Sequence, residues 1–171
     1  MPDAMIPNLQ TRGQPAFEQM STSETSALIA QARALQRAAH AGTTQPLLKG
    51  KNLGLLCASD DDADALLFRR AATELGAHVS HIRPSLSEAS TAQEVAHTAR
   101  MLGRLYDAVE CQGMPLALVR RMGEAAGVPV FGGIATAGHP TARLVEQLEG
   151  GSRIAENRRF VLQASLLSSI A

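Results

Sequence analysis

The chain has 171 residues, a length that suits one compact domain, and 45% of them are apolar, enough for a core. Its 16 basic and 16 acidic residues balance, and only four Phe and one Tyr are present, so we expect no nucleic-acid partner. No apolar run approaches the roughly 18 residues of a membrane span, and two cysteines make no disulfide framework, so we expect a cytoplasmic protein that has reduced thiols and no membrane partner.

The first half of the chain predicts a flexible arm followed by a helix, a strand and a second helix. Residues 1–15 are polar and rich in proline, which is typical of a loose segment. Ser21 and Glu24 have capping-box spacing, and apolar residues then recur at helical spacing to about residue 41. Residues 52–58 form an almost continuous apolar run, as expected for a strand buried on both faces. A helix over about 62–75 follows, and Gly76 ends it.

The second half continues the alternation of strands and helices. Strands are predicted over 78–82, 107–111 and 128–131, and helices over about 91–105, 115–126 and 139–148. Thr91 and Glu94 again have capping-box spacing, and Pro140 suits the first turn of its helix. A glycine-rich joint at 150–153 precedes a final amphipathic helix over about 154–170.

This alternation predicts an α/β fold: a single three-layer domain with a four-stranded parallel sheet flanked by helices. In such sheets, ligands bind beyond the carboxyl ends of the strands. Ser59, Gln112, Gly132 and His139 all follow predicted strands, so we expect them around one crevice.

The junction after the first strand carries an unusual run of carboxylates, Asp60, Asp61 and Asp62. A helix N-terminus at such a junction offers free N–H groups to an anion. We interpret the aspartates as residues that cap these N–H groups and interact favourably with the helix dipole. Two alternatives stay open: a divalent cation bound by these carboxylates together with Asp64, and a small, cationic ligand.

Other polar or reactive residues favour structural roles. His139 is interpreted as a residue at a helix start, and the Arg158–Arg159 pair as part of a solvated helix face. Cys57 and Cys111 are expected in neighbouring strands as small apolar residues, with a redox pair as the alternative.

Four segments share their order and spacing with the motifs of one enzyme family. Residues 102–107 (LGRLYD) are similar to its LGRMYD, and residues 49–52 (KGKN) to the GKN before its first strand. Residues 128–130 (VPV), followed by Gly133, resemble its VPVxNGL, and residues 139–141 (HPT) match three letters of its HPTQ. The register holds without a gap from about residue 19 to 148. The chain therefore resembles the aspartate/ornithine carbamoyltransferases, and the ornithine branch most closely.

The C-terminal residues extend the resemblance. Residues 155–158 (AENR) and the helix after them resemble the last helix of ornithine carbamoyltransferases, which follows a whole second domain and packs back on the first. Here a few residues stand in place of that domain. The resemblance implies a flexible arm (1–15), a carbamoyl-phosphate-domain-like α/β domain (16–149), a glycine-rich joint (150–153) and a C-terminal helix that packs back on the domain (154–171).

Most of the family's ligands for carbamoyl phosphate have no counterpart in this chain. The phosphate-binding STRTR segment corresponds to Asp61, Asp62, Ala63, Asp64 and Ala65. The arginine of YRG, the glutamine of HPTQ and the lysine that reaches a neighbouring subunit correspond to Gln112, Ala142 and Ala92, so that only His139 and Thr141 remain. Losing three cationic contacts removes about 5–9 kcal/mol of binding free energy, whereas micromolar affinity amounts to about 8 kcal/mol. The resemblance thus implies a degenerate carbamoyl-phosphate site without catalytic residues.

Three functions follow from the resemblance. The first is an inactive oligomerising or regulatory subunit, without a cofactor, in a homotrimer or in a mixed oligomer with a full-length carbamoyltransferase. The second is a small-molecule or metal sensor whose altered crevice uses Ser59, Asp60, Asp61, Asp62, Gln112 and His139. The third is residual carbamoyltransferase activity.

Overall fold

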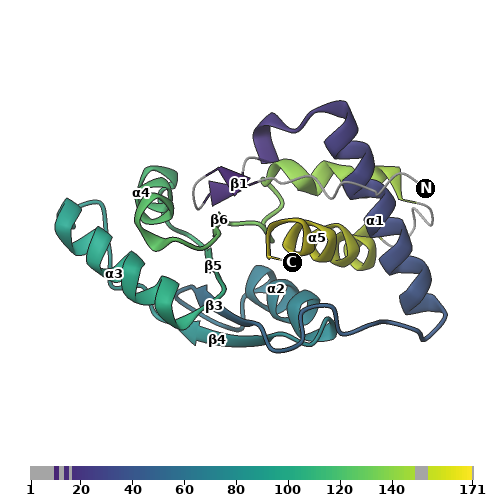
Figure 1. Ribbon diagram of the computed structural model, residues 1–171, viewed down its shortest axis with the longest axis horizontal. Helices are drawn as coiled ribbons and strands as arrows, with labels where there is room; N and C mark the ends of the chain where they lie inside the picture. Colours follow the sequence, from purple (N-terminus) through teal and green to yellow (C-terminus); the bar gives the residue numbers. More distant parts are fainter. Residues whose placement is uncertain (1–9, 12–13, 16, 149–153, 171) are drawn as a thin grey trace.

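Four parallel strands lie at the centre of the computed structural model, which describes residues 10–11, 14–15, 17–148 and 154–170 (Figure 1). They are β3 (Asn52–Leu56), β4 (His78–Ile82), β5 (Ala108–Cys111) and β6 (Val130–Gly132), paired in the order β4-β3-β5-β6. The apolar residues of β3 and β5 are buried on both faces. Three of the five residues of β4 are polar, none is fully buried, and this strand forms an edge of the sheet. The predicted α/β fold with a four-stranded parallel sheet is confirmed.

Helices cover both faces of this sheet, as the predicted three layers require. One face carries α1 (Thr22–His40), α2 (Ala63–Glu74), α5 (Ile154–Ile170) and the 3-10 helix η2 (Pro140–Gln147). The other face carries α3 (Ala92–Leu105) and α4 (Leu116–Ala126), which pack against each other and on Leu56, Val109 and Val130. The core is therefore split by the sheet into two apolar clusters.

Two helices begin at the capping boxes that the sequence predicts. The Ser21 hydroxyl accepts a hydrogen bond from the Glu24 N–H at 3.1 Å, and the Glu24 carboxylate accepts one from the Ser21 N–H at 2.7 Å. Thr91 and Glu94 repeat this arrangement at the start of α3, with distances of 3.1 and 2.9 Å. Each box satisfies two N–H groups that a helix N-terminus leaves without partners.

The final helix α5 packs on the domain, and it is not amphipathic. It is enclosed by α1, α2 and η2 (Figure 1), and every residue from 157 to 169 is buried. Its polar side chains are accommodated inside the fold: Arg159 pairs with Glu74 at 3.0 Å, and Gln163 donates to the Ala71 carbonyl oxygen at 3.2 Å. The helix is therefore buried on all sides, and its apolar residues do not form a single stripe.

Several boundaries differ from the sequence prediction. An antiparallel pair, β1 (Gln10–Thr11) and β2 (Gln14–Pro15), was not predicted, and β2 packs near β6 and α4. The 3-10 helix η1 (Phe17–Gln19) follows it. The segment after Pro140 is a 3-10 helix rather than an α-helix, although its buried residues, at 141, 144, 145 and 148, recur at the spacing of an α-helix. The predicted joint at 150–153 and most of the predicted arm lie outside the described residues.

Gly103 marks a close approach between α3 and the end of α4. A Cβ atom at this position would lie 1.9 Å from the Ala126 carbonyl oxygen, which is backbone and cannot rotate away. Within a helix, Gly→Ala normally stabilises by about 1 kcal/mol. Here we expect Gly103→Ala to lower the free energy of unfolding by about 2–3 kcal/mol, because α3 and α4 must separate.

Urea denaturation measures this difference. Gly138→Ala is the matched control, since nothing lies within 4 Å of its added Cβ, and it should change stability by less than about 0.5 kcal/mol. A Gly103→Ala variant as stable as the unchanged chain would refute the close contact.

Candidate functional site

The strand order places the candidate site at the carboxyl ends of the neighbouring strands β3 and β5, from which the chain connections run to opposite sides. Chain connections leave β3 toward β4 through α2 and return to β5 through α3, so the carboxyl ends of β3 and β5 form the switch point of the sheet. Around this point lie the loop after β3, the end of β5, the segment that follows β6 and the start of η2. These are the elements that carry the residues singled out in the sequence.

The aspartate loop does not converge on a single point. Asp60 turns toward the edge strand, where its carboxylate lies 3.8 Å from His81 Nδ1. Asp61 accepts a hydrogen bond from the Ser59 hydroxyl. Asp62 is the N-cap residue of α2, but its side chain makes no capping bond, which corrects the interpretation that it caps the helix N–H groups. Asp60, Asp61 and Asp62 are all exposed.

A divalent cation gains no support from this loop geometry. Within the described ranges, no three acidic, histidine or cysteine side chains are placed so that they could hold a metal ion. The first turn of α2 contains Asp64, which is half-buried, and Ala65, which is fully buried in the core.

Glu110 is a residue that the sequence analysis missed. Its side chain is fully buried at the end of β5, and its carboxylate accepts hydrogen bonds from the N–H groups of Gly133, Ile134 and Ala135 at 2.9, 3.1 and 3.2 Å. Gln112 Nε2 lies 3.5 Å from the same carboxylate. Burial raises the pKa of Glu110 to about 7, although these hydrogen bonds oppose the shift. A charged residue inside the otherwise apolar run of β5 was the available signal.

Arg158 is the second residue that the sequence analysis misjudged. It was expected on a solvated face, but both Arg158 and Arg159 are buried. Arg158 Nη2 donates to the Ile134 carbonyl oxygen at 2.5 Å. Among the described residues, its Nε and Nη1 atoms have no hydrogen-bond partner. Burial lowers its pKa, and the nearby carboxylates of Glu110 and Asp64 oppose that shift. The sequence predicted that this arginine lies near the start of the last helix. Its burial follows from the packing of other elements around α5, which the sequence did not reveal.

His139 is the N-cap residue of η2. Its Nδ1 accepts a hydrogen bond from the Thr141 N–H at 3.3 Å and lies 2.8 Å from the Thr141 hydroxyl. Its ring meets the buried Phe17 ring edge-on, with 5.3 Å between centroids. Burial, with Arg158 nearby, lowers the pKa of His139 to about 4, so the imidazole is neutral near pH 7. This histidine therefore caps the Thr141 N–H group and packs against Phe17.

The inner part of the site thus gathers Asp64, Glu110, Gln112, His139 and Arg158, whereas Ser59, Asp60 and Asp61 bond locally or at the edge of the sheet. Thr141 is fully buried beside His139, and Ala142 follows it in η2. One cation therefore lies among carboxylates at the carboxyl end of the sheet.

The two cysteines lie at adjacent strand ends but face opposite sides of the sheet. Cys111 is paired in register with Leu56, and Cys57 comes one residue later. Cys111 packs in the cluster under α3 and α4, and Cys57 in the cluster on the other face. Both thiols are free and buried, and burial raises the pKa of each. Opposite faces argue against the redox pair left open above.

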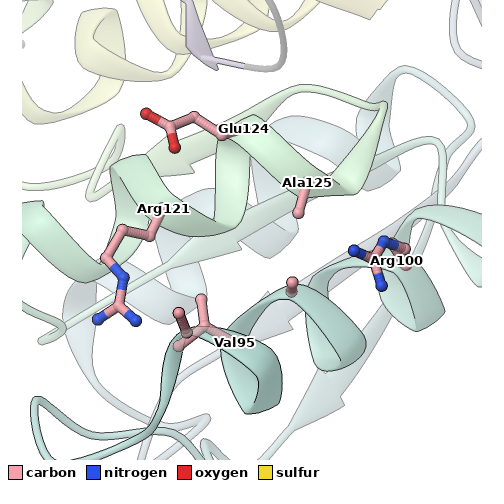
Figure 2. A pocket seen from close by; sticks show the side chains of 7 residues that line it. Val95, Arg100, Arg121, Glu124 and Ala125 are labelled. Carbon is pink, nitrogen blue, oxygen red and sulfur yellow. The ribbon is translucent and has the colours of Figure 1, made fainter.

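A separate hollow of about 370 Å³ lies between α3 and α4. Figure 2 shows Arg121 and Arg100 toward its two ends, Val95 and Ala125 between them, and Glu124 pointing away from α3. Ala92 and Ala96 complete the lining. Small side chains make the floor of this hollow, and guanidinium groups make its rim.

None of the helices in the described part of the chain is long and apolar enough to cross a membrane.

The pKa of His139 gives a testable dependence of stability on pH. Its pKa is 6.5 as a free group and about 4 in the fold. Below pH 6.5 the unfolded chain binds a proton that the folded chain does not, so the free energy of unfolding falls as the pH drops from 6.5 toward 4. His139→Asn keeps a capping oxygen but cannot titrate. Relative to the unchanged chain, it should gain roughly 2 kcal/mol between pH 7.5 and pH 4.5.

Thermal and urea unfolding across this pH range measure the gain. Exposed His97, changed to Asn, is the control and should leave the pH dependence as it is. Parallel curves for His139→Asn and the unchanged chain would mean that His139 titrates normally in the fold.

Comparison with known proteins agrees with the motifs and the fold. The family model for aspartate/ornithine carbamoyltransferase, carbamoyl-P binding domain, matches residues 15–149. The chain is 39% identical over 141 residues to an ornithine carbamoyltransferase from Cutibacterium acnes and 38% identical to one from Actinobacillus pleuropneumoniae. Each alignment covers 82% of this chain but 42% of the relative, so the chain spans less than half the length of these relatives.

Solved structures share the fold. The ornithine carbamoyltransferase from Pyrococcus furiosus superposes with a TM-score of 0.68 at 22% identity, over 82% of this chain and 45% of that one. The aspartate transcarbamoylase from Trypanosoma cruzi gives 0.63 at 24% identity, over 86% and 46%. The resemblance predicted from four short motifs is thus confirmed: this chain belongs to the aspartate/ornithine carbamoyltransferase family and carries its carbamoyl-P binding domain.

Proposed function

We propose that this chain is a non-catalytic member of its family that acts by associating with copies of itself or with a full-length carbamoyltransferase. The observation that carries the proposal is the charge at the start of α2. The residues that correspond to the phosphate-binding STRTR segment are Asp61, Asp62, Ala63, Asp64 and Ala65, and the carboxylates of Asp61 and Asp62 are exposed. Exposed carboxylates at this helix start repel a phosphate.

The positive charge of Arg158 does not offset this reversal of charge at the start of α2. Arg158 is held by the Ile134 carbonyl oxygen, and its charge is opposed by the carboxylates of Glu110 and Asp64. Three lost cationic contacts are worth about 5–9 kcal/mol, which is the whole of a micromolar affinity. His139, one of the two ligand residues of the family that remain, is neutral near pH 7 and packs against Phe17.

The part of the family that the chain matches fits the same proposal. In the family that the chain resembles, a second domain binds ornithine, whereas residues 15–149 match the carbamoyl-P binding domain, and the chain covers 42% of the Cutibacterium acnes relative. The helix α5 packs directly on this domain.

The association surface that we propose lies on α3 and α4. In the family, the first domain forms the trimer contacts, and the lysine that reaches a neighbouring subunit corresponds to Ala92. Ala92 lines the hollow of Figure 2 together with Val95, Ala96 and Ala125. Small side chains between Arg100 and Arg121 leave room for a neighbouring chain with acidic groups.

A second candidate function is ligand sensing through the altered crevice. The observation that favours it is the buried Arg158 guanidinium, two nitrogens of which have no partner among the described residues, beside Asp64, Gln112 and His139. A panel of amines, anions and divalent cations that raised the melting temperature would support sensing over association. Citrulline formation by the purified chain would contradict both functions and indicate residual carbamoyl transfer.

Isothermal titration with carbamoyl phosphate tests the loss of the phosphate site. We expect no heat from the unchanged chain up to millimolar ligand. A variant with Asp61→Ser, Asp62→Thr, Ala63→Arg and Asp64→Thr should bind measurably, because Ala63 is exposed and has room for an arginine. Ala65 is left unchanged because it is fully buried.

The control for this titration removes the charges without adding a cation, by changing Asp61, Asp62 and Asp64 to Asn. It should bind more weakly than the variant that carries the arginine. Clear binding by the unchanged chain would contradict the proposal.

Light scattering after size-exclusion chromatography tests association. We expect a mass of three times the 18.0 kDa chain, or co-elution with a full-length ornithine carbamoyltransferase. Ala96→Arg fills the hollow with a charged side chain and should dissociate the complex, since Ala96 of α3 lines the hollow. Ala34→Arg, on the exposed side of α1, is the matched control and should leave the mass unchanged. A chain that stays monomeric and does not co-elute with the full-length enzyme would overturn the proposed association.

A further inference from the structure

The segment Gly133–Ala135 is held from two sides by buried groups of opposite charge. From β5, the Glu110 carboxylate accepts the N–H groups of all three residues within 3.2 Å. From α5, Arg158 Nη2 donates to the Ile134 carbonyl oxygen at 2.5 Å. Ile134 is itself fully buried. The two charges are therefore connected through one residue, which gives its N–H to the carboxylate and its C=O to the guanidinium.

This arrangement ties together elements that are distant in sequence. Glu110 ends a central strand, residues 133–135 lead from β6 toward His139 and η2, and Arg158 lies in the first turns of the closing helix. The sheet, the candidate site and α5 meet at this point. A change at Glu110 therefore acts on all three.

We propose that Glu110 and Arg158 form a proton-controlled clamp on residues 133–135, which holds the closing helix and the start of η2 to the strand ends and loosens when Glu110 takes up a proton. The inference goes beyond the proposed function, since it holds whether or not the chain associates or binds a ligand.

The geometry of the carboxylate explains the loosening. One of its oxygens accepts from Gly133 and Ile134, and the other accepts from Ala135. A protonated oxygen becomes a donor, so the N–H group that faces it loses its acceptor. Protonation on the oxygen that faces Ala135 costs that hydrogen bond and also removes the negative charge beside Arg158.

The charged and titratable neighbours of this clamp come from each element packed around it. Gln112 and the Cys111 thiol lie beside Glu110 on β5, the Cys57 thiol follows β3, and Arg158 comes from α5. Behind Arg158 lie Asp64 of α2 and His139 of η2. Both thiols have raised pKa values and stay neutral, and His139 is neutral near pH 7. Burial raises the pKa of Glu110 to about 7, so Glu110 is the group that changes charge in the neutral range.

Local order and global stability should respond to this proton with opposite signs. The folded pKa of Glu110 lies above its free value of 4.5, so the fold binds the proton more tightly than the unfolded chain does. The contribution of Glu110 to the free energy of unfolding is therefore greatest at low pH and declines as the pH rises through 7. The clamp, by contrast, is tightest when Glu110 is ionised. A side chain with a purely structural role would not separate these two readouts.

Amide hydrogen exchange by NMR, on the full chain at pH 8 and pH 6 and corrected for intrinsic exchange rates, tests the clamp. We expect protection at Ala135 to fall about tenfold at pH 6, the weight of one hydrogen bond, while protection of Val119 and Met122 in α4 does not fall. In Glu110→Gln, protection at Ala135 should be the same at both pH values. Glu124→Gln, at an exposed position, is the matched control and should behave as the unchanged chain.

The pH midpoint gives a second readout that needs no Glu110 variant. Following the Ala135 amide shift with pH should yield a midpoint near 7, and Arg158→Gln should raise it because a neighbouring positive charge is lost. Arg120→Gln, exposed on α4, should leave it unchanged. Protection at 133–135 that is equal at both pH values, or that falls equally in α4, would overturn the proposal.

Discussion

The burial of α5 is the constraint on which the rest of the structure depends. This helix is enclosed by α1, α2 and η2, so a polar group on it that lacks a partner inside the fold costs free energy. Arg159 pairs with Glu74, Gln163 reaches the Ala71 carbonyl oxygen, and Asn157 accepts a hydrogen bond from Gln36 at 2.9 Å. Without α5, the apolar faces of α1 and α2 would lie open to water. The chain covers 42% of the Cutibacterium acnes relative, and its core is closed by this one helix.

The same helix determines the charge of the candidate site. Arg158 lies in its first turns and reaches the segment after β6, so the packing that closes the core also delivers a guanidinium to the strand ends. Glu110 opposes that charge from β5. Stability and site chemistry are therefore not separable here: moving α5 would change the surroundings of Glu110 and His139 together. The proposed clamp is part of this coupling, because Ile134 is hydrogen-bonded both to Glu110 and to Arg158 of α5.

The sequence predicted best where structure is local. The capping boxes at Ser21 and Thr91 and the apolar runs of β3 and β5 lie in short stretches, and they predicted the fold class and most elements. It failed where burial depends on distant segments. Arg158 and Arg159 look like any solvated pair on a helix until α1, α2 and η2 enclose them. Glu110 could be read as a charge within a strand, but the three N–H groups it accepts come from residues more than twenty positions later.

Three of the five positions that correspond to the phosphate-binding segment are exposed, whereas other residues of the candidate site are buried. Asp61, Asp62 and Ala63 are exposed, so exchanging side chains there costs the fold little, and this is where the charge of the crevice reverses. Thr141, Glu110 and Arg158 are buried and hydrogen-bonded to backbone or packed beside His139, so replacing them would leave groups without partners. Ala65 also corresponds to a position of that segment, but it is fully buried. The core packs closely around its small side chain, so a larger residue would not fit there without rearrangement. Ligand contacts made from the surface of a scaffold can therefore be lost while the scaffold stays intact, so the loss of the phosphate site that we propose is compatible with the architecture of a carbamoyl-P binding domain.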